Sequence, residues 1–168
     1  ELLIRGIVHP LFYSMSDKKV KREAFLPPPG RRDVSLLRRQ YSPDDHFCKK
    51  HCKSINIPSH TYCGMTTFIS SHVEEINRSD DGASTFYVAG TPIDENNIYI
   101  SSGPVYTDTP GLPMHADLMY SEATVKGIPS TGNRKLAQRL AKVSKFFFDE
   151  NPSLETWEGS KLNWSQND

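Results

Sequence analysis

The chain has 168 residues, which fits one domain that buries roughly two thirds of its unfolded surface. No run approaches the ~20 apolar residues of a membrane span, and the opening ELLIRGIVHP lacks a basic leader, so we expect neither a membrane helix nor a signal peptide. The net charge is zero, but it is the sum of +6 over residues 1–53, −8 over residues 74–122 and +2 over the rest. Either these segments complement one another internally, or they form a bipolar surface that steers a charged partner.

Strands dominate the expected elements. Alternation of apolar and polar residues, with many β-branched and aromatic side chains, predicts strands over residues 2–8, 33–41, 62–73, 85–93, 97–105 and 114–120. A further short strand is expected within residues 22–33. On the first strand, Ile4, Gly6 and Val8 are expected to share one face. The basic stretch SMSDKKVKR that follows predicts a solvated loop or hairpin.

Two helices are also expected. The segment SPDD supplies Ser42 as an N-cap and Pro43 at the first helical position, which predicts a helix over about 43–55. The segment RKLAQRLAKVSKFFF predicts a second helix over about 133–148. Its apolar stripe recurs at helical spacing and comprises Leu136, Leu140, Val143 and Phe147.

These elements define an α+β fold. We expect a mostly antiparallel sheet with two principal helices. Residues 1–150 form a single domain in this interpretation, and residues 151–168, which include Trp157 and Trp164, form a polar, loosely packed tail.

The segment HFCKKHCKSINIPSHTYC, residues 46–63, contains all three cysteines of the chain. Cys48 and Cys52 would share a helix face, and His60 and Cys63 could fold back toward them to complete a Cys₃His zinc site. The interpretation that we favour makes the two helical cysteines part of an apolar stripe, with no metal or cofactor. An odd number of cysteines also argues against a complete disulfide framework, which favours a reducing, cytoplasmic compartment.

A second candidate site precedes the last helix, in the segment KGIPSTGNRK, residues 126–135. Free backbone N–H groups and basic side chains at a helix N-terminus favour an anion. The candidate residues are Lys126, Ser130, Thr131, Arg134 and Lys135. The segment does not match the phosphate-binding P-loop pattern, and the interpretation that we favour is a capped helix with a solvated basic face.

Four short segments of the chain occur in the order found in one family. They are HPLF (9–12), REAFLPPP (22–29), DVSLLR (33–38) and PMHADL (113–118). Together they resemble an uncharacterised family of small bacterial proteins with an N-terminal His-Pro-x-Phe, a Leu-Ser-type strand and a late Pro-x-His-Ala motif. The resemblance spans residues 9 to about 118 and implies no established activity. It places His9, Phe25, Ser35, His115 and Ala116 at the motif positions.

Two functional hypotheses follow. The first is a soluble binding or accessory protein of a bacterial operon-encoded assembly, such as a defence or toxin-related system. Its expected partner is a protein, and nucleic acid or a nucleotide is the other partner class considered. Arg5, Ser35 and Arg38 are its binding residues. The alternative is a small metal-independent nuclease or nucleotide-processing enzyme in which His9 and His115 act as acid and base. In the first hypothesis each histidine instead bonds backbone at a strand end.

Overall fold

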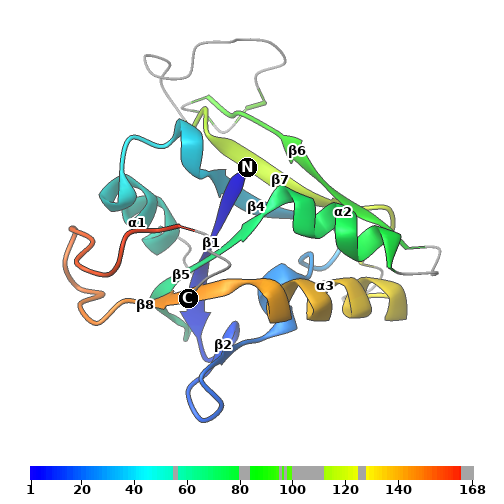
Figure 1. Ribbon diagram of the computed structural model, residues 1–168, viewed down its shortest axis with the longest axis horizontal. Helices are drawn as coiled ribbons and strands as arrows, with labels where there is room; N and C mark the ends of the chain where they lie inside the picture. Colours follow the sequence, from blue (N-terminus) through cyan, green and yellow to red (C-terminus); the bar gives the residue numbers. More distant parts are fainter. Residues whose placement is uncertain are drawn as a thin grey trace.

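The computed structural model describes residues 1–54, 57–79, 84–94, 96, 98–99, 112–124 and 128–163. Most of the strand expected over 97–105, together with Lys126 and Trp164, lies outside these residues. The described chain forms a six-stranded sheet in the order β6-β7-β4-β1-β5-β8, with a two-stranded hairpin, β2-β3, beside it (Figure 1). Every pair of neighbouring strands is antiparallel, which confirms the α+β class.

The elements have the following bounds. The strands are β1 Leu2–His9, β2 Tyr13–Ser14, β3 Lys19–Val20, β4 Asp33–Arg38, β5 Thr61–Ile69, β6 Phe86–Gly90, β7 His115–Tyr120 and β8 Lys145–Phe148. The α-helices are α1 Asp45–Lys53, α2 Ser70–Arg78 and α3 Thr131–Val143, and the 3₁₀ helices are η1 Arg22–Phe25 and η2 Arg39–Tyr41. No helix among the described residues is long and apolar enough to cross a membrane.

Two hydrophobic cores lie on opposite faces of the sheet. The larger core contains Leu3 of β1 and Phe68 of β5 and is covered by α2, α3 and η1. The smaller core contains Ile4 of β1 and Met65 of β5 and is covered by α1. Successive residues of a strand point to opposite faces, so β1 is buried on both sides. The register shifts between Ile7 and Val8, and for this reason Val8 joins the larger core instead of sharing a face with Ile4 as expected.

The described chain has one more α-helix than the two expected. Residues 70–78, expected in part as the end of a strand, form α2, whose Val73 and Ile76 are buried three residues apart. Residues 22–25, expected within a short strand, form η1. The cap of α1 also differs, because the Asp44 carboxylate accepts the N–H of Phe47 at 2.7 Å while the Ser42 hydroxyl donates to the Arg38 carbonyl.

The last helix is shorter than expected, and a strand follows it. Helix α3 ends at Val143, and Lys145–Phe148 forms β8, which pairs with β5 at the edge of the sheet. The period-2 placement of the aromatic run puts Phe147 in the smaller core, away from the stripe of α3. Gly64 of β5 permits this pairing, since a side chain there would collide with the Phe147 carbonyl.

The segment after β8 is polar and largely exposed, but it is anchored. Trp157 and Leu162 are 7% and 3% exposed and belong to the smaller core. The N–H of Trp157 donates to His46 of α1 at 2.7 Å, and its indole donates to the Ser160 carbonyl at 2.9 Å. The expectation of loose packing is therefore wrong for this segment as far as Asn163.

We predict that Leu140→Ala lowers the free energy of unfolding by about 2–5 kcal/mol, because Leu140 is fully buried in the larger core. Denaturant unfolding monitored by circular dichroism measures the change. Gln138→Ala, at an exposed position of the same helix, is the matched control and should change stability by less than about 0.5 kcal/mol. Equal effects of the two substitutions would contradict the docking of α3 through this stripe.

Candidate functional site

A small cavity on the α1 side of the sheet brings together two of the expected binding residues and one of the two candidate catalytic histidines. Arg5, Ser35 and His115 line a space of about 220 Å³, together with His51 and Cys52 of α1. Its remaining walls are mainly apolar, formed by residues such as Ile4, Leu37, Ile93 and Leu112. The cavity is therefore a small apolar space with a few polar groups at its edge.

The guanidinium of Arg5 fills a gap in the sheet. Strands β1 and β4 pair only at Leu3↔Arg38 and Ile4↔Leu37. Beyond that point Arg5 donates to the Ser35 carbonyl at 2.9 Å and to the Ala24 carbonyl at 3.2 Å. Burial lowers its pKa to about 10, against the opposing effects of Cys52 and Asp117. These bonds replace backbone ladder bonds, so the main role of Arg5 is to hold β4 and η1 on β1.

His115 belongs to a polar cluster with Thr91 and Asp117. Its Nδ1 lies 2.8 Å from the Thr91 carbonyl, which can only accept, so Nδ1 carries the proton. The Thr91 hydroxyl donates to Oδ2 of Asp117 at 2.7 Å. The Nε2 atom of His115 faces Oδ1 of Asp117 at 3.9 Å, and that oxygen is buried without a hydrogen bond from the described residues. The cluster ties the chain after β6 to β7.

His9 and Arg38 lie away from this cavity. In the sheet, His115 of β7 is the register partner of Leu37 of β4, and Leu37 is the register partner of Ile4 of β1. His9 lies five residues beyond Ile4 along β1, a distance of about 16 Å by strand geometry. The Nδ1 atom of His9 contacts the Tyr13 carbonyl at 3.3 Å. Acid and base catalysis by His9 and His115 on one substrate group requires hydrogen-bond reach, which this separation excludes in this conformation.

Arg38 points to the opposite face of β4 from Ser35. It forms a bidentate ion pair with Glu1, with N–O distances of 3.0 and 2.9 Å, and its guanidinium stacks on the Tyr41 ring at 4.2 Å. An arginine held in this way organises the start of the chain and η2.

The expected anion site at the N-terminus of α3 is only partly assembled. Ser130, Thr131 and Arg134 line one hollow of about 600 Å³, and Lys135 does not. The Ser130 hydroxyl is already used as the helix cap, accepting the N–H of Asn133 at 3.1 Å. Glu122 lines the same hollow, and its negative charge offsets the positive charge of Arg134, which makes the hollow less favourable for an anion. The capped-helix interpretation therefore accounts for these residues.

The cysteines are buried in two separate cores. Cys48 and Cys52 belong to the smaller core and Cys63 to the larger one, on the other face of the sheet. His60 is turned to the Pro58 carbonyl at 2.7 Å. The structure does not bring the Cys₃His set together, and the described residues contain no other group of His, Cys, Asp and Glu placed to hold a metal.

We predict that the three thiols react with the thiol reagent DTNB only after unfolding. Burial raises the pKa of Cys48 and of Cys63 to about 11, and it raises that of Cys52 as well, so the reactive thiolate is scarce at neutral pH. Absorbance should show little release in native buffer and three equivalents in guanidinium. Rapid release of even one equivalent from the native protein would contradict the burial of that thiol.

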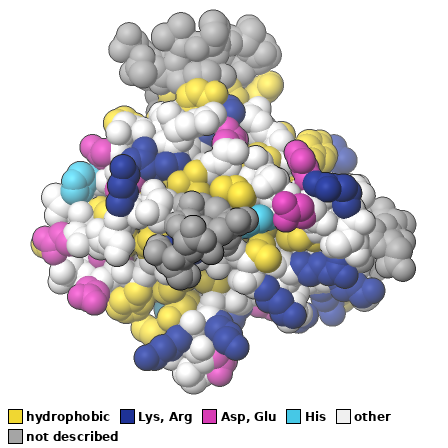
Figure 2. All heavy atoms as spheres, viewed as in Figure 1, with side chains coloured by type: hydrophobic (Ala, Val, Ile, Leu, Met, Phe, Trp, Pro, Cys, Tyr) yellow, Lys and Arg dark blue, Asp and Glu magenta, His cyan; other side chains and the backbone are white. Residues whose placement is uncertain are grey.

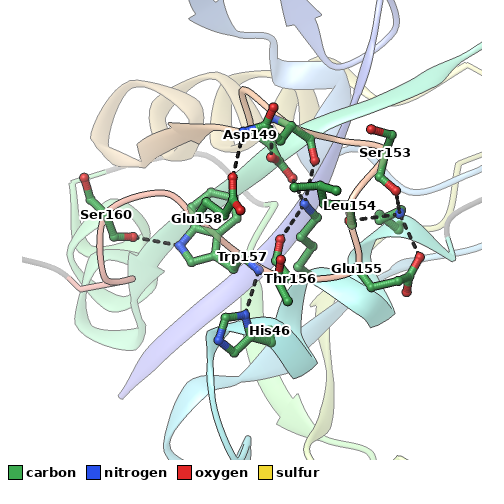
Figure 3. Close-up of polar contacts among 12 residues, drawn as sticks. His46, Asp149, Ser153, Leu154, Glu155, Thr156, Trp157, Glu158 and Ser160 are labelled. Carbon is green, nitrogen blue, oxygen red and sulfur yellow. Dashed lines mark hydrogen bonds and ion pairs between the residues drawn. The ribbon is translucent and has the colours of Figure 1, made fainter.

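A buried ion pair joins α1 to the C-terminal segment (Figure 3). The Nζ atom of Lys49, which is fully buried, lies 2.8 Å from the Asp149 carboxylate and donates to the carbonyls of Asn151 and Thr156 at 2.9 Å each. The neighbouring Tyr62 is buried too, and its pKa is raised chiefly by that burial. Three oxygen atoms lie within 2.9 Å of the ammonium and solvent has no access to it, so the role of this cluster is structural.

We predict that Lys49→Met lowers the free energy of unfolding by about 3–5 kcal/mol, because it leaves the Asp149 carboxylate buried without its cation. The double variant Lys49→Met/Asp149→Asn should recover part of the loss, since it removes the orphaned charge and keeps the amide oxygen as an acceptor. Urea unfolding of the three proteins measures both steps. A double variant less stable than Lys49→Met would contradict the assignment.

One hollow among the described residues is a basic groove, which we define by its cationic lining residues Lys18, Lys19, Lys21, Arg22 and Lys142. It has a volume of about 970 Å³ and lies between the β2-β3 hairpin, the C-terminal half of α3 and β8. Figure 2 shows Lys and Arg side chains gathered over the hairpin and along α3. Glu23 is the one acidic residue among the lining residues, and it is paired with Arg22 at 3.1 Å.

The sequence alone does not predict this groove. The run KKVKR predicts a solvated loop or hairpin, and the hairpin is present, but nothing in the run indicates what it faces. Comparison with known proteins gives no match to a family model, a curated protein or a solved structure. The resemblance to the bacterial family therefore stays a prediction.

Proposed function

We propose that this protein is a non-catalytic binding protein that holds a polyanionic partner in the basic groove. The observation that carries the proposal is the charge of the groove: five cationic side chains surround it, and the single carboxylate among its lining residues is engaged by one of them. A concave surface with one sign of charge concentrates ligands of the opposite sign and speeds their association.

Burial of the other charged candidates supports the same proposal. Arg5 and Lys49 spend their donors on backbone carbonyls, and Lys49 also on Asp149, inside the fold. Lys18, Lys19 and Lys142, by contrast, are exposed on the rim of the groove. Charge that is presented to solvent on one concave surface is available to a partner, whereas charge consumed within the core is not.

The binding proposal also suits the two histidines of the resemblance. Both His9 and His115 place Nδ1 against a backbone carbonyl, of Tyr13 and Thr91 respectively. This is the arrangement that the binding hypothesis expects of them. The role we assign to them is to fix loop geometry around the sheet.

We extend the resemblance to the cellular setting. We propose that the protein acts in the cytoplasm as an accessory component of an operon-encoded bacterial assembly, with defence and toxin-related systems as the first place to look. Three free, buried thiols suit a reducing compartment. A polyanion held in the groove would be the means by which the protein recruits its cargo to such an assembly.

Binding of fluorescein-labelled heparin, followed by anisotropy as salt is raised, tests the proposal. We predict that heparin binds at low salt, with an affinity that falls steeply as salt rises. Lys19→Ala/Lys142→Ala should bind about 10- to 30-fold more weakly, from about 1 kcal/mol per lysine beside an anionic surface.

The matched control is Lys50→Ala/Arg32→Ala, which removes two exposed cations that do not line the groove. It should bind as the wild type does. Absence of heparin binding by the wild type at about 50 mM salt, where charge-driven binding is strong, would refute the proposal. Equal weakening by the two double variants would place the polyanion elsewhere.

A further inference from the structure

The basic groove has an aromatic floor as well as a charged rim. Phe146 and Phe148 of β8 line it, and because they are two residues apart on a strand they point to the same face. Their ring centroids lie 6.3 Å apart with the planes inclined at 70°. Tyr13 of the hairpin packs against Phe146 with centroids 4.4 Å apart, which fixes the hairpin against β8. The floor is thus a braced aromatic platform.

Phe148 is the exposed member of this platform. It is 45% exposed, although its neighbour Phe147 is buried at 7% in the smaller core. Lys145 covers the Phe147 ring, at 5.4 Å, and so lies toward the opposite face of β8 from Phe148. A large aromatic ring presented to solvent inside a cationic groove has an open face on which a flat group can stack.

We infer that the polyanion held by the groove is single-stranded nucleic acid, an inference that rests on the proposed function. Cations along a groove neutralise successive phosphates, while an aromatic floor stacks the bases between them, and this combination is typical of proteins that bind single strands. A duplex keeps its bases inside and offers only phosphates, so it would leave Phe148 unused. Heparin and polyphosphate have no bases and would leave it unused as well.

Competition among labelled and unlabelled polymers tests the inference. The probe is a fluorescein-labelled oligothymidylate, and the competitors are oligouridylate, a DNA duplex of equal length, heparin and polyphosphate. Oligothymidylate and oligouridylate should bind with similar affinity, and the duplex more weakly. The logarithm of the association constant should fall with log salt at a slope of about −2 to −3.5, from three to five phosphates neutralised on a single strand.

The stacking step is tested with Phe148→Ala. It should weaken oligothymidylate binding about 5- to 150-fold, which is the usual loss for one base stack, and leave heparin binding unchanged. The matched control is Tyr87→Ala on β6, the opposite edge strand, where the side chain is 56% exposed and lies outside the groove. It should bind both polymers as the wild type does.

Phe148→Trp supplies a direct signal. The new indole should be quenched by oligothymidylate and not by heparin, with circular dichroism of each variant confirming that the fold is retained. Binding of heparin and oligonucleotides with equal affinity, unaffected by Phe148→Ala, would overturn the nucleic-acid inference and leave the proposed function standing. Preference for the duplex would also overturn it. Failure to bind any polymer would overturn both.

Discussion

The pairing of β8 with β5 is the constraint on which the rest of the molecule depends. The ladder runs from Gly64↔Phe148 to Thr67↔Lys145 and fixes which aromatic side chain faces which side of the sheet. Phe147 packs in the smaller core. On the other face, Phe146 packs against Tyr13 of the hairpin, and Phe148 lines the groove. The strand also delivers Asp149 to Lys49, because the N–H of Asp149 bonds the Cys63 carbonyl at the end of the ladder. A shift of one residue in this register would exchange the two faces and dismantle both cores and the groove together.

The same strand explains the main error of interpretation from sequence. Leu136 and Leu140 recur at helical spacing and are fully buried on α3, so the helix and its inner face could be predicted. Phe147 continues that spacing by coincidence, and a period of 3.6 cannot be distinguished from a period of 2 over a run of three identical residues. Only the partner strand, far away in the sequence, makes KFFF a strand. The aromatic floor of the groove was invisible for this reason.

Other parts were predictable because the signal was local. The strands around Ile4, Leu36 and Leu118 could be identified from apolar patterns, and α1 from an acid and a proline near its start. The position of Asp117 beside His115 was also predictable, because Asp117 follows His115 by two residues on a predicted strand and must share its face. The grouping of Arg5, Ser35 and His115, and the exclusion of His9, depend on strand order and register. Neither can be obtained from one sequence, because pairing over long separations is decided by the whole core.

Under the proposed function, burial separates the charged residues that stabilise the fold from those that bind the partner. Lys49 is tolerated inside the fold because a carboxylate and two carbonyls surround it, and removal of any partner would leave a costly buried group. Arg5 is tolerated because it takes the place of missing ladder bonds. The lysines on the rim of the groove need no such partners, since water solvates them until a ligand replaces it. Their contribution to folding is therefore small, and it is their clustering beside an exposed aromatic ring that asks for an explanation outside the fold. The proposed partner, a single strand that supplies both phosphates and flat bases, would provide it.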